Sequence, residues 1–259
     1  MKKYWFVFSG SDVLLEKHAD GTFSIPLAEE PPTAVCDGED IRRVTPLGDI
    51  EVRTYRLRDD NYDSCRYALC GLRASYYKLP SDMYLKAGKC SEILYWDSNN
   101  VYCGKCGGRM RWKTDISKQC EACDREIWPQ LSTAIIVLVH RDDEMLLVHA
   151  NNFRGNFYGL VAGFVETGET LEQAVEREVR EETGLTIRNI TYYASQPWPY
   201  PCGLMIGFYA EYASGDIRLQ RSEIASGGWY RSDNLPQLPE KLSIARRLID
   251  HFLTDMAGK

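Results

Sequence analysis

The segment Gly163–Leu185, GFVETGETLEQAVEREVREETGL, concentrates carboxylates in a way that could do chemistry. At about 100° per residue, a helix places Glu178 and Glu182 on the side of its apolar residues and Glu181 at the edge of that side. Glu178 and Glu182 repel each other at i,i+4, in the last turns, where the helix dipole is negative. A solvated acidic face would not share its side with core residues. A bound cation resolves the conflict, and oxygen ligands without nearby His or Cys indicate Mg²⁺ or Mn²⁺.

The limits of this helix follow from its flanking residues. Thr170 and Gln173 form a T-x-x-Q capping box, which predicts a helix beginning at about Leu171. Gly184 follows Thr183 and suits the left-handed position after a helix end. The three acids therefore lie on a helix of about three and a half turns.

The segment resembles the Nudix box, G-x5-E-x7-R-E-U-x-E-E-x-G-U, in which U is aliphatic. It matches at every specified position: Gly163, Glu169, Arg177, Glu178, Val179, Glu181, Glu182, Gly184 and Leu185. Nudix enzymes use divalent metal ions to hydrolyse a nucleoside diphosphate linked to another moiety. The resemblance implies that Glu178 and Glu182 are metal ligands and that Glu181 is a further ligand or the base that activates water. It also implies a structural salt bridge between Glu169 and Arg177.

Four cysteines form a second motif. Cys103-x2-Cys106 and Cys120-x2-Cys123 are separated by thirteen residues, the spacing of a zinc ribbon with tetrahedral thiolate coordination. The alternative is four coincidental free thiols. Four thiolates leave no open position, so the Zn²⁺ would be structural, and the mixed charges of the segment favour a linker or dimer-supporting role over nucleic-acid binding. The remaining cysteines in the first hundred residues are predicted to be buried thiols: Cys36, Cys65, Cys70 and Cys90.

The segment Ser195–Pro201, SQPWPYP, alternates prolines with aromatic residues. The prolines favour an extended, stiff backbone, which would present Trp198 and Tyr200 for stacking on a planar base. The alternative is a connector whose aromatic rings cover the core. The segment resembles SQPWPFPxS, the mark of NADH pyrophosphatases, also known as NAD-capped RNA hydrolases. Tyr200 stands in place of Phe, and Gly203 in place of the final Ser, which removes a hydroxyl that could bind substrate.

This resemblance implies hydrolysis of the pyrophosphate bond of NAD(H) to NMN(H) and AMP. In NAD-capped RNA the same cut would leave a 5′-monophosphate RNA. It further implies a homodimer, and metal ligation by the Ala162 carbonyl and by Glu223 beside the box glutamates. Phe164 would stack on a base, and Trp128 would help to form a base pocket across the dimer. The substrate contacts implied by position are Arg66, Trp128, Phe164, Gln196, Pro197, Trp198, Pro199, Tyr200, Pro201, Cys202, Gly203 and Ala245.

Two other functions are open. Gly203 leaves room for a Nudix hydrolase that prefers ADP-ribose or another nucleoside diphosphate derivative. A catalytically silent Nudix fold with a nucleic-acid-binding ribbon would be a regulator, but it would have no reason to keep three acids on an apolar face. For Arg66, an ordinary surface arginine is the competing interpretation.

Composition excludes some classes of protein. The apolar and charged fractions, 44% and 26%, are those of an ordinary globular protein, and a net charge of −6 argues against strong sequence-independent nucleic-acid binding. The apolar run near Met1 is too short for a signal peptide, and no run is long enough to span a membrane. An odd number of cysteines, four of them in a metal pattern, favours a reducing cytoplasm.

The order of predicted elements indicates three parts. Residues 1–98 are predicted to be a small α+β domain, residues 99–130 a zinc ribbon, and residues 131–259 a Nudix α/β/α sandwich with a mixed sheet. The expected elements are strands at Tyr4–Phe8, Asp12–Leu15, Phe23–Leu27, Ile41–Val44, Ile50–Leu57, Ala134–Val139, Glu144–Val148, Leu160–Phe164, Thr191–Ser195, Met205–Tyr212, Ile217–Leu219 and Gly228–Tyr230, and helices at 64–74, at 81–95 with Ser81 as N-cap, and at 241–255.

Overall fold

A computed structural model describes residues 1–35, 41–57, 61–153 and 155–257. Cys36, expected to be a buried thiol, lies outside the described residues. The chain forms two compact units, residues 1–131 with 199–202 and residues 132–198 with 203–259. The three-part division at residues 98 and 130 stays a prediction. Among the helices of the described ranges, none is both long enough and apolar enough to span a membrane.

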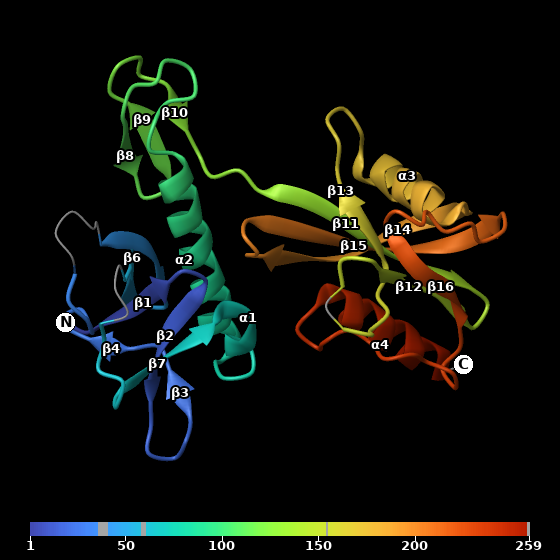
Figure 1. Ribbon diagram of the computed structural model, residues 1–259, viewed down its shortest axis with the longest axis horizontal. Coiled ribbons are helices and arrows are strands. Elements are labelled where there is room, and N and C mark those ends of the chain that lie inside the picture. The colour runs from blue at the N-terminus through green and yellow to red at the C-terminus, as the bar shows by residue number, and fades with distance from the viewer. Residues whose placement is uncertain (36–40, 58–60, 154, 258–259) are drawn as a thin grey trace. The chain divides into compact units, whose positions relative to one another are not determined.

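The first unit is built on a seven-stranded sheet (Figure 1). Its strands are β1 (Lys3–Ser9), β2 (Asp12–Lys17), β3 (Phe23–Ser24), β4 (Leu27–Ala28), β5 (Arg42–Leu47), β6 (Ile50–Arg56) and β7 (Tyr67–Gly71). β1 lies between β2 and β6 and pairs in parallel with β6, while β5 and β6 form a hairpin, with Gly48 at φ 58° in the turn. The single strand predicted at 23–27 is wrong, because β3 pairs with β2 and β4 with β1. Pro26, between them, has no N–H to donate to a ladder.

Two helices complete this unit, α1 (Leu72–Ser75) and α2 (Ser81–Asn99). The helix predicted at 64–74 is wrong except at its end, where residues 72–74 belong to α1. Its centre is β7, which pairs with β2 from Gly71 opposite Asp12 to Tyr67 opposite Glu16. A free strand edge that needs backbone partners has overridden the local preference here. The long helix is confirmed, but Pro80 rather than Ser81 occupies its N-cap. Cys70 and Cys90 are buried as expected, whereas Cys65 is exposed.

A small three-stranded sheet follows α2 within the same unit. It consists of β8 (Met110–Thr114), β9 (Ser117–Cys120) and β10 (Glu126–Ile127), in the order β10-β9-β8 and antiparallel throughout. Met110 lies buried against Cys103 and Cys120, so the core of this sheet is little more than the cysteines themselves. A core this small calls for a metal ion or another cross-link.

The second unit contains a six-stranded mixed sheet. Its strands are β11 (Ser132–Arg141), β12 (Glu144–Ala150), β13 (Val161–Phe164), β14 (Thr186–Trp198), β15 (Gly203–Ser214) and β16 (Ile224–Tyr230). The order is β14-β15-β11-β12-β16, with β13 also paired to β11. β11 and β15 run parallel and the other pairs antiparallel.

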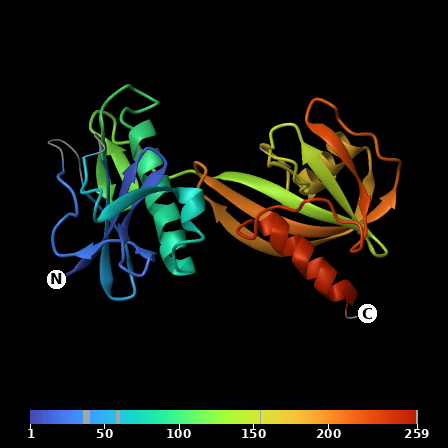
Figure 2. The ribbon, with the colours of Figure 1, turned by 60° about the horizontal axis from the view of Figure 1, so that its bottom comes forward.

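Helices α3 (Leu171–Thr183) and α4 (Ile244–Ala257) cover opposite faces of this sheet, as Figures 1 and 2 show. The strand period of two sends Ile135 and Val137 of β11 into the core under α3, and Ile136 and Leu138 into the core under α4. Such runs without polar alternation are expected of strands buried on both faces. The predicted sandwich with a mixed sheet is confirmed.

Candidate active site

Helix α3 begins and ends where its sequence predicts. The Thr170 hydroxyl accepts the Gln173 N–H at 3.3 Å, and the Gln173 side chain accepts the Thr170 N–H at 2.8 Å, which completes the capping box. Gly184 adopts the left-handed conformation, with φ 74°, and ends the helix. These two ends set the rotation at which Glu178 and Glu182 become buried against the sheet while Glu181 stays exposed.

Gly163 of β13 leaves the space that the Glu178 carboxylate occupies. A Cβ on Gly163 would lie 1.9 Å from a carboxylate oxygen of Glu178, far inside van der Waals contact. Any side chain at this position would therefore displace the carboxylate. The absent side chain lets β13 and α3 bring an acid directly against the strand backbone.

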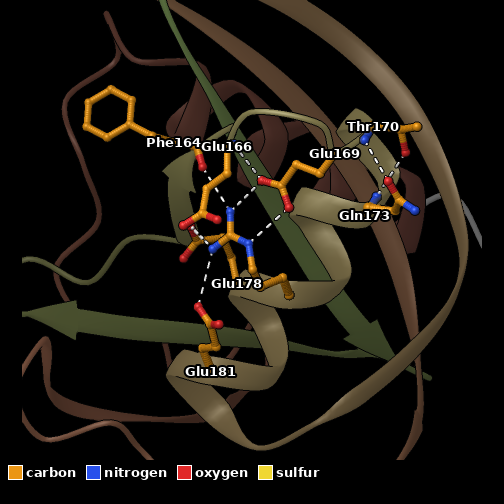
Figure 3. Close-up of polar contacts among 8 residues, drawn as sticks. Phe164, Glu166, Glu169, Thr170, Gln173, Glu178 and Glu181 are labelled. Atoms are coloured by element: carbon orange, nitrogen blue, oxygen red, sulfur yellow. Dashed lines mark hydrogen bonds and ion pairs between the residues drawn. The ribbon is translucent and has the colours of Figure 1, made fainter.

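Arg177 joins the parts of the site, and Figure 3 labels its acidic partners Glu169, Glu178 and Glu181. Its guanidinium binds Glu169 with two hydrogen bonds, of 2.6 and 3.0 Å, and donates to the Phe164 carbonyl at 2.9 Å. The other terminal nitrogen donates to Glu178 at 2.8 Å and to Glu181 at 3.2 Å. The two bonds to Glu169 hold its pKa at about 2, well below the usual range. The expected salt bridge exists, and its arginine also anchors two of the three helix acids.

Burial has the opposite effect on the deeper acids. Glu182 is 5% exposed, and burial, followed by the charges of Glu178, Glu223 and Glu181, raises its pKa to about 8. Burial also raises the pKa of Glu178, although Arg177 pulls it down. For both glutamates, the loss of solvent contact raises the pKa more than the repulsion between the acids does.

The carboxylate oxygens of the acidic site do not converge on one point in this structure. Within the described ranges, the one group of three or more metal-binding side chains with donor atoms within 4.8 Å of one another is the cysteine cluster discussed below. In the acidic site, Glu178 and Glu181 each turn an oxygen toward Arg177. Glu182 Oε2 is buried and accepts no hydrogen bond from any residue that the structure describes. A buried carboxylate oxygen among other acids is suited to bind a cation.

The segment predicted as a strand at 217–219 is irregular instead, and the reason lies in α3. The N–H groups of Arg218 and Gln220 donate to the carbonyls of Thr183 and Glu182, at 2.7 and 2.9 Å. The segment thus satisfies carbonyls of the last helical turn rather than a strand neighbour. It leads to Glu223, an exposed residue whose charge raises the pKa of both Glu178 and Glu182. The structure therefore brings Glu223 into the electrostatic neighbourhood of the helix acids.

Asn151, which follows β12, is a residue that sequence reasoning missed. Its N–H donates to the Glu223 carbonyl at 2.7 Å, and its side chain donates to the carbonyls of Arg221 and Ser222, at 3.1 and 2.9 Å. One asparagine thereby binds three consecutive residues of the segment that carries Glu223. The sequence holds no signal for this, since an asparagine after a strand is an ordinary turn residue.

The proline-aromatic segment is a hairpin end. Residues 195–198 extend β14 and pair with β15, and residues 199–202 form the turn. The prediction of a backbone held extended by prolines is wrong for the second half, where the chain reverses, and in the first half the strand pairing supplies the rigidity. Residues 199–202 also belong to the first compact unit and their flanking strands to the second. Gln196 donates from its side chain to the Leu242 carbonyl at 2.7 Å, and its Oε1 is buried without a hydrogen-bond partner.

Gly203 has a local reason in this hairpin. It pairs with Trp198, and a Cβ at position 203 would lie 3.0 Å from the Trp198 carbonyl oxygen, which is closer than a relaxed contact. The glycine therefore suits this particular turn. A hydroxyl side chain at 203 would require the turn to shift.

The other predicted contacts lie in varied surroundings. Phe164 is 66% exposed at the end of β13, and its ring points away from the acids (Figure 3). Ala162 pairs with Ile136, one residue before Gly163. Ala245 is buried in the core under α4. In the first unit, Trp128 is 53% exposed, and Arg66 forms an ion pair with Glu16 at 2.9 Å and lies over the Tyr67 ring.

The four motif cysteines form a compact cluster in the first unit. Their sulfurs lie within 4.8 Å of one another, with Cys103 and Cys123 3.8 Å apart and Cys106 and Cys120 3.5 Å apart. A tetrahedral Zn²⁺ with bonds of about 2.3 Å would place sulfurs about 3.8 Å apart. The N–H of Lys105 points at Cys103 Sγ, and such bonds hold the pKa of Cys103 at about 6. The donor set and its spacing fit a zinc ion.

Comparison with known proteins agrees with both halves of the chain. A family profile described as "NUDIX domain" matches residues 129–252, and one described as "NADH pyrophosphatase-like rudimentary NUDIX domain" matches residues 2–96. A protein of Pectobacterium atrosepticum named "NAD-capped RNA hydrolase NudC" is 45% identical over 169 residues, which span 65% of this chain and 65% of that protein. A protein of Stutzerimonas stutzeri with the same name is 43% identical over 190 residues, 73% of this chain and 69% of the relative.

Solved structures support the fold. A Nudix hydrolase from Nitrosomonas europaea superposes with a TM-score of 0.52 at 21% identity, covering 61% of this chain and 93% of that one. At this identity the similarity speaks for the fold alone.

Proposed function

Because this chain belongs to the family of Nudix hydrolases that carry an NADH pyrophosphatase-like N-terminal domain, we propose that it hydrolyses the pyrophosphate bond of NAD(H). The products are NMN(H) and AMP. On RNA with a 5′ NAD cap, the same reaction releases NMN and leaves a 5′-monophosphate. The relatives named as NAD-capped RNA hydrolases support this choice of substrate.

The site would hold Mg²⁺ or Mn²⁺ through the carboxylates of Glu178, Glu182 and Glu223 and the Ala162 carbonyl. The buried oxygen of Glu182, which accepts no hydrogen bond, is the single observation that carries this proposal. When bound, a divalent ion neutralises the phosphate charge and acidifies a water molecule. Hard oxygen donors without nitrogen or sulfur suit these ions.

The protein's own groups have separable tasks in this proposal. Glu181 is exposed, so it is available to orient the attacking water or take its proton, with Glu182 as the other candidate. Arg177 holds Glu178 and Glu181 in place from within the helix. Bare carboxylates would repel an anionic diphosphate, and a bound divalent ion would offset that repulsion. Glu182, whose pKa is about 8, would lose its proton when the ion binds at neutral pH.

The remaining predicted residues would bind the substrate and hold the assembly. Gln196 to Gly203 would line the nucleotide site, with Trp198, Tyr200 and Phe164 as stacking surfaces and Ala245 beside them. Trp128 would help to form a base pocket across a homodimer interface, and Arg66 would contact the substrate. The four motif cysteines would hold one structural Zn²⁺ per chain, and such thiolates suit a reducing cytoplasm.

A side-by-side assay tests this function. NADH, NAD-capped RNA and ADP-ribose are offered with Mg²⁺ or Mn²⁺, and NADH and the capped RNA are expected to give the highest kcat/KM. A clear preference for ADP-ribose would favour the second candidate, which Gly203 keeps open because its turn carries no hydroxyl. If the protein turned over none of the three, the enzymatic proposal would be abandoned.

Glu178→Gln isolates the proposed metal site. Loss of one ligand charge is expected to lower kcat/KM by about two to three orders of magnitude. Glu172→Gln, on the exposed flank of α3, is the matched control and should keep wild-type activity. Full activity in the Glu178 variant would refute the ligand assignment.

A further inference from the structure

A basic pocket of about 470 Å³ lies inside the first unit, where β5, β6, the end of α2 and the cysteine-bearing sheet meet. Its walls carry five cationic side chains from four separate elements and their connections: Arg42, Arg56, Arg109, Arg111 and Lys118. This concentration stands out in a chain of net charge −6. Along the sequence these residues are spread over 77 positions, among acids, so the linear pattern hides them.

Part of the positive charge is structural. Lys118 is 3% exposed and donates to the Asp97 and Asn100 carbonyls, at 2.8 Å each, at the C-terminal end of α2. It also forms an ion pair with the Asp97 carboxylate, which lies 3.4 Å from Arg42. The Arg42 guanidinium lies 4.7 Å from the centre of the Trp112 ring. This network joins the cysteine-bearing sheet to α2 and builds a rigid floor.

The three other cationic side chains of the pocket are more accessible to a ligand. Arg109 is exposed, and its side chain makes no ion pair or hydrogen bond among the described residues. Arg56 donates to the Gly10 carbonyl, at 3.3 Å, and to no other group among the described residues. Arg111 is paired with Glu121, and both are more than half or about half exposed, at 59% and 50%. Among the described residues, the five cations of the pocket stand against Asp97 and Glu121, an excess of three positive charges.

We propose that this pocket binds the phosphodiester backbone of a single-stranded RNA. Arginine guanidiniums match phosphate oxygens in shape and charge, and four of the five cations are arginines. The protein as a whole is negatively charged and repels a polyanion. A nucleic acid is therefore expected to bind where the local charge is positive. The volume lies in the range of ordinary ligand sites. That the bound nucleic acid is RNA rests on the proposed function, in which the substrate is an RNA chain that continues beyond its NAD cap.

Fluorescence anisotropy with the full-length chain tests the pocket. The probe is a 20-nucleotide single-stranded RNA with a 5′-monophosphate and a 3′ fluorophore. It has no pyrophosphate bond to hydrolyse, so no chelator is added and the cysteine cluster keeps its zinc. Arg109→Glu is expected to weaken binding about tenfold or more and to flatten the salt dependence. Arg125→Glu is the matched control, since Arg125 is exposed on the same small sheet but outside the pocket, and its effect should stay within twofold.

The outcomes separate this inference from the proposed function. Equal losses of RNA affinity in the two variants, or no RNA binding by the wild-type chain, would overturn the proposal that this pocket binds RNA. Displacement of the RNA by inorganic phosphate at constant ionic strength would also overturn it, because the pocket would then be a small-anion site. In the hydrolysis assay, Arg109→Glu should raise the KM for NAD-capped RNA at least fivefold relative to the KM for NADH. Wild-type RNA binding without any hydrolysis would sink the proposed function and leave the pocket standing.

Discussion

The four motif cysteines and the acids of α3 are both potential metal ligands, but only the cysteines are already arranged as a coordination site. The four cysteine sulfurs already lie at the separations of a tetrahedral site, held by tight turns and N–H···S bonds. The acids of α3 form no such cluster: two of them bind one nitrogen of Arg177, and the deepest has an oxygen that accepts no hydrogen bond from the described residues. The first arrangement closes around one ion, while the second leaves directions free for water and substrate.

The difference teaches that charge balance can be met in two ways. At the cysteine cluster, backbone N–H groups lower the pKa of Cys103 to about 6. The Gly108 N–H lowers the pKa of Cys106 as well, but hydrogen bonds with the Cys123 and Cys120 thiols raise it to about 12. At the acidic site, burial raises the pKa of Glu182 to about 8, so ion binding there would release a proton from this carboxyl at neutral pH.

The largest effect is expected from Cys120→Ser. A structural zinc site contributes about 10 kcal/mol or more of apparent binding free energy, and the small sheet around it has almost no other core. The variant should lose its zinc, measured by elemental analysis, and the thermal unfolding of the first unit should shift strongly downward. Cys65→Ser, at an exposed cysteine outside the cluster, serves as the control. A variant that kept one zinc per chain would remove the contrast between the two sites.

A smaller effect is expected from Glu182→Gln, and it depends on pH. In the metal-free protein the pKa of Glu182 is about 8, above the usual value of 4.5, so between these pH values the folded state binds a proton that the unfolded state has lost. The free energy of unfolding must then fall as pH rises from about 4.5 to 8. In Glu182→Gln the side chain does not titrate, so this fall is absent. The metal-free variant should melt about 5 °C or more above wild type at pH 9 and equally at pH 5.

Glu176→Gln, on the exposed side of α3, controls for the loss of one negative charge. Calorimetric titration with Mn²⁺ in buffers of different ionisation enthalpy gives a second readout. The wild-type protein should release protons at pH 7, and Glu182→Gln should release fewer. Identical pH profiles for wild type and variant would contradict the protonated state of Glu182.

The smallest effect is expected from Asn151→Ala. The substitution removes the two side-chain hydrogen bonds to the segment before Glu223 and leaves its own N–H in place. The Mn²⁺ concentration for half-maximal activity should rise about tenfold, with saturated kcat within twofold of wild type. Asn152→Ala, at the exposed neighbour, is the control. A fall in kcat without any change in Mn²⁺ dependence would show that Asn151 does not position the ligand.

The failures of sequence reasoning share a cause. Residues 67–71 carry no feature that rules out a helix, yet the edge of β2 recruits them as a strand. Residues 217–219 look like a strand, yet the unpaired carbonyls of α3 take their N–H groups. In both places a partner distant in sequence satisfied the backbone, and local pattern carries no record of such a partner.

Sequence alone determined the acidic helix, its caps, the spacing of the four motif cysteines and the strand at Ala134–Val139 in the second unit. Each depends on spacing within a short window, where helix period, strand period and ligand spacing act directly. Only the tertiary structure decided that Gly163 makes room for Glu178, that Asn151 holds the segment of Glu223, and that the first unit gathers arginines around one pocket. Those features join residues far apart in the chain, and their energies come from contacts that exist only once the chain has folded.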